Sequence, residues 1–534
     1  MANSFGSSRP ATTATEPSGR PFLVDTASQS EEDAQDSQDC SKTILKRGNG
    51  LAAKINNWLD RSHGRPSDLV AAGLEALDSI NLGVAVTNGA RQLLLTNRTA
   101  EQILATRDGV EATASGGLAT LKRCGSPSLS VVIQQVAQGT FSGSSPANNA
   151  VLAVRRPSGK RPLTLVVRAV QGGTSQADAL RTVLVFMLDP ELSVQATEGG
   201  LRQLYGFTSS EARLAHLLMS GKTLDECCEH LGIRPSTGRM HLGNLFAKAQ
   251  VDRQGQLISL LLKSVGMVCT EGADARAGQS GQYTDCGESS AKDGRAKGRG
   301  PDTLAAGMEA LDLLNVGVGV TNGLCQLLFA NHTAQQILAA RDGLEVTTEG
   351  VLGTLKKSSS PPLSTLIRQV ALGTLRGTSG DMVLAVRRSS GKRPLTLLLR
   401  SLRERSAEKH PTAPAVLVFV LDPELPVAAT ESGLRQLYGF TSTEARLAHL
   451  LMEGNALEDC CDQLDIRLST ARMHLGNLFA KTGVQRQGQL ISLLLKSVGM
   501  VRVRSDEGLV KIPNISGLPL RISRSTQPAR ALNS

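Results

Sequence analysis

Apolar and polar residues alternate with a two-residue period from about residue 82. LGVAVTN and QLLLTN predict two strands, and the Asn-Gly pair between them favours a hairpin turn with positive φ. TAEQIL then predicts a helix with Thr99 as its N-cap, and a second helix follows at 129–138. NAVLAVRRPSGKRPLTLVVRAV predicts two strands joined at Ser158-Gly159, and TVLVFMLDPE predicts a last strand. This order indicates an antiparallel sheet with helices packed on one side.

After residue 208 the apolar positions take up a helical period. The pattern predicts two short helices, a tight turn and a longer helix, STGRMHLGNLFAKA, which is the layout of a helix-turn-helix. The residues expected to bound these helices are Thr208 with Glu211 as a capping box, Gly221, Thr223, Gly232, and Ser236 or Thr237.

The same two-part pattern occurs twice. Residues 201–268 and 434–501 align without a gap, and about 54 of the 68 positions are identical. The strand-rich part is repeated as well, since GLEALDSINLGVAVTNGARQLLLTNRTAEQIL at 73 recurs as GMEALDLLNVGVGVTNGLCQLLFANHTAQQIL at 307. A match of this length indicates duplication of the whole unit.

The chain of 534 residues suits three to five domains by the usual domain size. We expect a disordered region with a short basic helix at 1–65, a strand-rich unit at 66–192, a helical unit at 198–268 and a flexible linker at 269–302. A second strand-rich unit at 303–426, a second helical unit at 431–501 and a disordered basic tail at 502–534 follow. The fold class is therefore α+β, with antiparallel-sheet domains alternating with all-α domains.

Composition narrows the possible partners. The net charge of +10 favours a polyanion, and aromatic residues make up only 3%, which disfavours base stacking. No apolar run of membrane-spanning length and no signal sequence is visible, so a cytoplasmic protein without a membrane partner is expected. The nine cysteines show neither a disulfide framework nor zinc-ligand spacing, and no cofactor is predicted.

The strand-rich units resemble PAS domains over about 115 residues each, through the order of elements and the phrases LGVAVTN, PSGKRPL and VLVFMLDPE. The resemblance implies a sensor or pairing domain. An unknown small ligand and self-association through these units are the partners that it suggests. The first unit has Arg98 where the second has His332, so haem ligation in both copies is unsupported.

The helical units resemble the C-terminal domain of LuxR-type regulators. That family shows L-G-I, then T-V-x-x-H-x-x-N-I-F-x-K and G-V. The first copy supplies Leu231, Gly232, Ile233, Thr237, His241, Asn244, Phe246, Lys248 and Val251. The second supplies Ile466, Thr470, His474, Asn477, Phe479, Lys481, Gly483 and Val484. The resemblance implies double-stranded DNA as the partner.

Recognition helices of this kind place side chains near their N-termini on base edges. By the family match the base-reading positions are Arg239, Met240 and Gly243 in the first copy and Arg472, Met473 and Gly476 in the second. Asn244 and Asn477 of the motif are also expected to be DNA-binding residues. Ser236, Thr237, Ser469 and Thr470 suit a phosphate at the helix start, and Lys248, Lys481 and Arg253 suit the flanking DNA backbone. An arginine suits guanine and a methionine suits a thymine methyl group.

The two copies are not expected to be equivalent. Residues 201–268 carry eight Lys/Arg against five Asp/Glu, roughly +3, and residues 434–501 carry seven against six, roughly +1. Asp465 replaces Gly232 and Glu453 replaces Ser220, so weaker phosphate binding is predicted for the second copy. Gly238 inside the first recognition helix costs up to about 1 kcal/mol relative to alanine, so that helix is predicted to be locally looser.

Several residues have ordinary structural interpretations that we favour. His241 and His474 are predicted to be packing residues near the phosphate backbone. The cysteine pairs at 227–228 and 460–461 are predicted to be buried apolar filler, since adjacent helical residues diverge by about 100°. The basic hairpin tips are predicted to be solvated turns; they comprise Arg155, Arg156, Lys160 and Arg161 and, in the second copy, Arg387, Arg388, Lys392 and Arg393.

Two functions stay open at this point. The first is a transcriptional regulator in which one chain carries two DNA-reading domains as a single-chain pseudo-dimer. The second is a protein-interaction module whose helical units have lost base reading, as Gly243 and Gly476 suggest. An enzyme is not expected, because no phosphate-binding glycine motif, nucleophile elbow or histidine-glutamate metal motif is visible.

Overall fold

The computed structural model describes residues 66–121, 128–141, 149–170, 181–192, 198–266, 301–355, 362–374, 381–402, 415–499 and 501. All of these lie in one compact unit, 55–534. The predictions for the N-terminal region, its short helix and the basic tail lie outside the described residues. We use the names first front unit (66–192), first head (198–266), second front unit (301–426) and second head (431–501).

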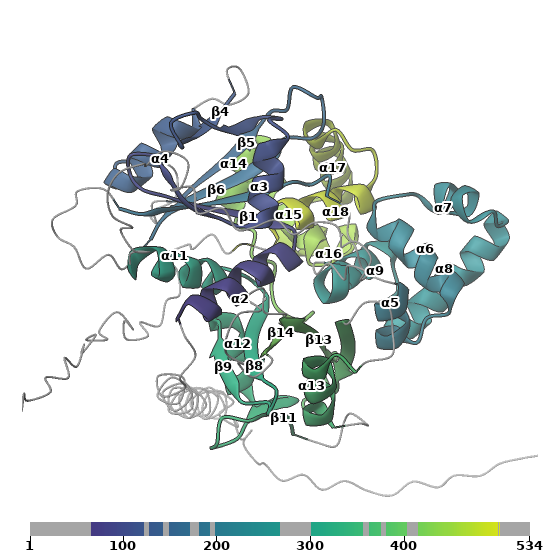
Figure 1. Cartoon of the computed structure of the whole chain (residues 1–534). Helices are drawn as coiled ribbons and strands as arrows, with labels where there is room; N and C mark the ends of the chain where they lie inside the picture. The colour runs from purple at the N-terminus through teal and green to yellow at the C-terminus, as the bar shows by residue number, and fades with distance from the viewer. Residues whose placement is uncertain are drawn as a thin grey trace, which may run out of the picture. The chain divides into compact units, whose positions relative to one another are not determined.

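The first front unit is an antiparallel sheet with helices (Figure 1). Its elements are α2 (Pro66–Ser79), β1 (Leu82–Thr87), β2 (Leu93–Thr96), α3 (Arg98–Ala105), β3 (Val110–Ala112), β4 (Leu118–Thr120), α4 (Leu129–Gln138), β5 (Asn149–Val154), β6 (Leu163–Ala169) and β7 (Val183–Leu188). The strand order is β2-β1-β7-β6-β5, and β3 and β4 form a separate hairpin. The predicted helix at 129–138 is confirmed, whereas α2 and the β3–β4 hairpin were not predicted.

The second front unit repeats this arrangement. Its elements are α11 (Pro301–Asp312), β8 (Gly317–Asn322), β9 (Leu327–Ala330), α12 (His332–Ala340), β10 (Leu344–Val346), β11 (Leu352–Thr354), α13 (Leu363–Leu372), β12 (Asp381–Val386), β13 (Leu395–Leu402) and β14 (Ala415–Leu421). Its sheet order is β12-β13-β14-β8-β9, and every pair is antiparallel. Helix α11 begins inside the stretch 269–302 that was predicted as a linker.

Both faces of the first sheet are buried, which corrects the prediction of helices on one side. One face packs with α3 and α4 into a cluster that includes Ile103, Val132 and Leu165. The other face belongs to a second cluster, in which residues of α2 and α11 join the two sheets. Strand β7 is buried at every position for this reason. The apolar runs therefore reflect a sheet that is covered twice.

Asn97, and not the predicted Thr99, is the N-cap of α3. Its side-chain oxygen accepts from the backbone N–H of Ala100 at 3.1 Å and of Val84 at 2.7 Å. Its amide nitrogen donates to the carbonyl of Leu82 at 2.7 Å. Asparagine is favoured over threonine as the cap because one carboxamide group can both cap the helix and hydrogen-bond to strand β1. Asn331 caps α12 in the second front unit in the same way.

Each head is a group of helices. The first contains α5 (Glu198–Tyr205), α6 (Ser209–Met219), α7 (Leu224–Leu231), α8 (Pro235–Ala249), α9 (Gln254–Leu261) and the π-helical turn η1 (Leu262–Gly266). The second contains α14 (Glu431–Tyr438), α15 (Ser442–Met452), α16 (Leu457–Leu464), α17 (Leu468–Thr482) and α18 (Gln487–Val498). In the first head α6, α7 and α8 form a three-helix group (Figure 1).

Candidate nucleic-acid interface

The turn between α7 and α8 sets the direction of the longer helix. Thr223 and Glu226 form a capping box at the start of α7, and Gly232 ends it with φ of 63°. Thr223 as the cap and Gly232 as the end of α7 were predicted, whereas Glu226 as the partner of Thr223 was not; the capping box of Thr208 and Glu211 on α6 was also predicted. Helix α8, however, starts at Pro235, with Arg234 as an extended N-cap, and not at Ser236 or Thr237. Proline is favoured there because its fixed φ suits the first helical turn and it needs no N–H partner.

Most of the predicted base-reading and phosphate-binding residues lie on the exposed side of α8 and α17. Met240 and Met473 are each 56% exposed, unusually high for a large apolar side chain. Thr237 and Thr470 are half-buried. The other exposed members of this set are Ser236, Arg239, Gly243, Asn244, Lys248, Ser469, Arg472, Gly476, Asn477 and Lys481. The two helices thus present the same residues at the same positions.

Lys248 is held against its own head by an ion pair. Its Nζ lies 2.6 Å from Oε2 of Glu211, a carboxylate whose side chain is only 3% exposed. Burial opposes ionisation of Glu211, but hydrogen bonds from Lys248 and the Thr208 backbone outweigh it and keep its pKa below the usual value. Lys481 and Glu444 form the same pair at 2.6 Å in the second head. The carboxylate occupies only one of the three N–H donors of each ammonium group. A phosphate that binds either lysine therefore binds it while the carboxylate is still in place.

The inner side of α8 packs tightly on α7. A Cβ atom added at Gly238 would lie 2.3 Å from Sγ of Cys228. Cys227 and Cys228 are both buried, and burial raises the pKa of the Cys227 thiol to about 12, as expected for apolar filler. His241 is half-buried, and its Nδ1 has no hydrogen-bond partner among the described residues. These positions support packing roles.

The two heads contact each other through α9 and α18. Ser259 Oγ donates to the Met452 carbonyl at 2.6 Å, and Ser492 Oγ donates to the Met219 carbonyl at 2.8 Å. Gly488 lies close to Ile258. Because equivalent residues make the same contact in each direction, this contact has the reciprocity of a two-fold interface. Apolar residues of both heads form one hydrophobic cluster.

Sequence reasoning missed this contact, although one signal pointed to it. The stretch RQGQLISLLLKSVGMV is unchanged between the copies, and it contains small and apolar residues that a single three-helix head does not need. Arg253, predicted as a phosphate contact, instead pairs across the heads with Glu458 at 2.7 Å.

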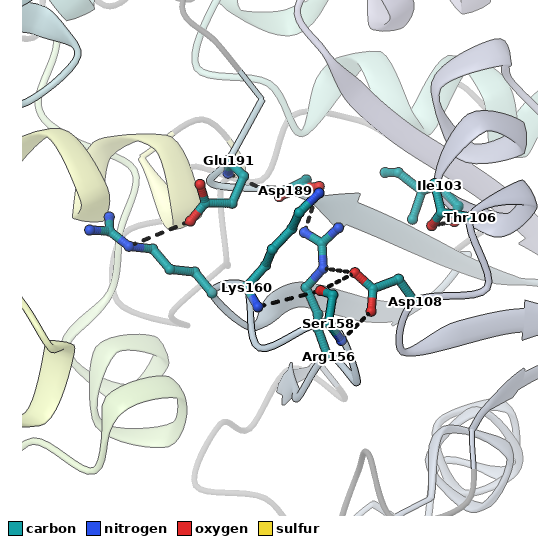
Figure 2. A network of polar contacts seen from close by, with 9 residues as sticks. Ile103, Thr106, Asp108, Arg156, Ser158, Lys160, Asp189 and Glu191 are labelled. Carbon is teal, nitrogen blue, oxygen red and sulfur yellow. Dashed lines mark hydrogen bonds and ion pairs between the residues drawn. The ribbon is translucent and has the colours of Figure 1, made fainter.

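The basic hairpin of the first front unit is not simply a solvated turn. Figure 2 shows Arg156 between Asp108 and Asp189, with 2.7 Å to an oxygen of each, and its side chain is 5% exposed. A hydrogen bond from the Ser158 hydroxyl is the main cause that lowers the pKa of Asp108 to about 2. Arg388 makes the equivalent pairs with Asp342 and Asp422. These two arginines hold the hairpin to the sheet, which corrects the prediction.

The described residues contain neither a membrane-spanning helix nor a cluster of metal-ligating side chains. Within those ranges no helix is long and apolar enough to cross a membrane. The same residues include no group of three or more histidine, cysteine or acidic side chains suited to a metal ion.

Comparisons with known proteins give distant structural similarity only. No family model and no curated protein matches the chain. A solved structure of the Vibrio cholerae VqmA dimer, described as a LuxR-type receptor, is 15% identical, covers 34% of this chain and 81% of its own, and has a TM-score of 0.14. A VqmA–ligand–DNA complex is 14% identical, with 35% and 85% covered and a TM-score of 0.16. An E. coli DhaR(N)–DhaL complex is 10% identical, with 76% and 94% covered and a TM-score of 0.15.

Proposed function

We propose that this chain is a DNA-binding transcriptional regulator whose two heads act as a single-chain pseudo-dimer. The observation that carries the proposal is the pair of like recognition helices, α8 and α17, on heads that contact each other reciprocally. Each helix exposes an arginine and a methionine, Arg239 with Met240 and Arg472 with Met473, which suit guanine and the thymine methyl group. Two equal readers related by a two-fold contact suit an inverted repeat of two equal half-sites.

The front units are proposed to be PAS-like sensor or pairing units. Pairing is supported by the hydrophobic cluster that joins both sheets through α2 and α11, which includes Leu77 and Leu311. A Cβ atom at Gly73 would lie 2.8 Å from Leu311, so the two helices approach closely. The proposal of an unknown small ligand rests on the resemblance alone.

The proposal that the chain is not an enzyme rests on the absence of catalytic motifs from its sequence, and cytoplasmic localisation is a further expectation. The alternative function is a protein-interaction module whose heads no longer read DNA. Gly243 and Gly476 favour it, because a glycine on the exposed side of a recognition helix offers no side chain to a base.

Selection of bound fragments from random DNA with the full chain tests the proposal. We expect a two-part inverted motif with one spacing. Replacement of both Arg239 and Arg472 by alanine should weaken binding to that motif by at least about 30-fold, since a good arginine–guanine contact is worth ~1–3 kcal/mol and two are lost. Binding to random DNA should change far less. A full chain that selects no motif, and binds DNA no better than its double variant, would favour the interaction module.

A further inference from the structure

The reciprocity between the heads is broken at Glu453. In the second head Glu453 follows α15, and its Oε2 lies 2.5 Å from Nζ of Lys263, which belongs to the first head. The side chains of Lys263 and Glu453 are 13% and 22% exposed, so water screens this pair much less than a surface pair. The first head has Ser220 at the equivalent position, and its hydroxyl donates to the carbonyl of Leu217 in its own helix.

The same carboxylate also binds the connection between the second front unit and the second head. Its Oε1 accepts a hydrogen bond from the backbone N–H of Val427. Next to Val427, the carbonyl of Leu425 accepts from Lys263 at 3.4 Å, and the carbonyl of Pro426 accepts from Asn315 at 2.9 Å. Glu453 therefore joins three segments: the end of the first head, the second head, and the stretch that leaves β14.

The backbone around Lys263 differs from its counterpart in the second head. Lys263 lies in the π-helical turn η1, whereas its counterpart Lys496 lies in α18, which is α-helical through Val498. Short π-helical turns inside helices occur often at functional positions. Among the described residues, no ion pair joins Lys496 to a carboxylate of the first head. Among the described residues, the ion pair between a lysine of one head and a carboxylate of the other is thus found on one side of the head pair.

We propose that Glu453 is a positioning residue that fixes the separation and angle of the two recognition helices, and so sets the half-site spacing that the chain accepts. This inference rests on the proposed function. The contacts from the Glu453 carboxylate to two other segments add to the Ser259–Met452 and Ser492–Met219 hydrogen bonds in resisting the sliding of α9 along α18. A shift of one head by a single base pair would have to break the Lys263–Glu453 pair or the bond to Val427.

The test uses the full chain and duplexes that carry the selected half-sites with spacers varied one base pair at a time. Wild type should lose affinity by about tenfold for each base pair away from the preferred spacing, which rigidly paired heads require. Glu453→Ser, which introduces the residue of the first repeat, should reduce that loss to about threefold or less. Glu453→Gln, which can keep the bond to Val427 but lacks the charge, should give an intermediate profile.

Glu458→Gln is the matched control. It removes the other ion pair between the heads, Arg253–Glu458, whose side chains are 54% and 57% exposed. An exposed pair contributes little, so its spacing profile should follow wild type. If Glu453→Ser lowers the melting temperature but leaves the spacing profile unchanged, Glu453 is a stabilising residue only and the proposal is wrong.

A measurement without DNA separates this inference from the proposed function. Spin labels on non-natural side chains at positions 240 and 473 report the distance between the recognition helices of the full chain. We expect one narrow distance distribution for wild type and for Glu458→Gln, and a broader one for Glu453→Ser. A broader distribution for Glu453→Ser, together with an unlabelled wild-type chain that binds no DNA, would keep the positioning role and reject the regulator. Equal widths in all three proteins would reject the positioning role.

Discussion

In the first head Gly238 leaves room for the Cys228 side chain, which is 2% exposed, whereas the second head has Ala471 and a slightly more exposed Cys461 at 8%. The glycine was expected to loosen the first recognition helix through its low helix propensity. Its place against α7 indicates a different role, because the missing Cβ allows a closer approach of α8 to the cysteine. The glycine thus destabilises the helix when helix propensity alone is considered, but it favours the packing of that helix against α7.

Helix ends show a second difference between the heads. Helix α7 has Thr223 at its start and Gly232 at its end, both suited to capping. Helix α16 has Ala456, which has no side-chain acceptor, as its N-cap and Asp465, with φ of 53°, as its C-cap. The second head therefore has the same residues at the predicted base-reading positions, but its helix α16 lacks the favourable cap residues that α7 has. Glu453 binds Lys263 and Asp465 ends a helix, and the weaker phosphate binding expected from their charge stays a prediction.

The front units differ in one buried cross-strand pair, and the largest expected effect concerns it. Asp381 and Arg400 lie opposite each other on β12 and β13, with bonds of 2.9 and 2.7 Å and side chains only 2% and 3% exposed. Asn149 replaces the aspartate in the first unit, where Arg168 pairs with Glu309 of α11 at 3.6 Å.

Asp381→Ala should therefore lower the free energy of unfolding of the second front unit by about 3–5 kcal/mol, because it removes one partner of a buried ion pair. Asn149→Ala, the matched change in the first front unit, should cost about 1 kcal/mol or less, since neither polar side-chain atom of Asn149 has a hydrogen-bond partner among the described residues. Denaturant unfolding, followed by hydrogen exchange of peptides from each sheet, measures both. Equal losses in the two variants would mean that the units rely on their arginines alike.

The packing at Gly238 gives the next largest effect. Gly238→Ala should destabilise the first head by about 1–3 kcal/mol, because the added methyl group overlaps Cys228 Sγ, although helix propensity alone predicts a gain of about 1 kcal/mol. Hydrogen exchange of α7 and α8 peptides measures the change. The double variant with Cys228→Ala should recover most of the loss. A stabilised single variant would restore the view that this helix is simply loose.

Patterns local to one segment were predictable from the sequence, and contacts between segments were not. The capping boxes at Thr208 and Thr223 and the helix at 129–138 follow from residues within one turn of each other. Asn97 was missed as a cap because its advantage comes from strand β1, thirteen residues earlier in the chain. The exposed positions on α8 and α17 that are predicted to read bases followed from a spaced motif. The Lys248–Glu211 pair and the contact between the heads depend on which helices meet, and no residue spacing encodes that.

The helix caps give the smallest expected effect and the most direct exchange between the heads. Thr223→Ala should lower the free energy of local opening of α7 by about 1 kcal/mol. The reason is that the backbone N–H of Glu226 loses the Thr223 hydroxyl to which it donates at 3.1 Å. Ala456→Thr should raise the free energy of local opening of α16 by a similar amount. The N–H of Asp459 gains an acceptor, and the hydrogen bond from the backbone N–H of residue 456 to the Asp459 side chain is already present. Hydrogen exchange of the two helices in the full chain measures both changes. If α16 is as well protected as α7 before any substitution, contacts with the rest of the head outweigh the missing cap, and the heads differ in sequence without differing in local stability.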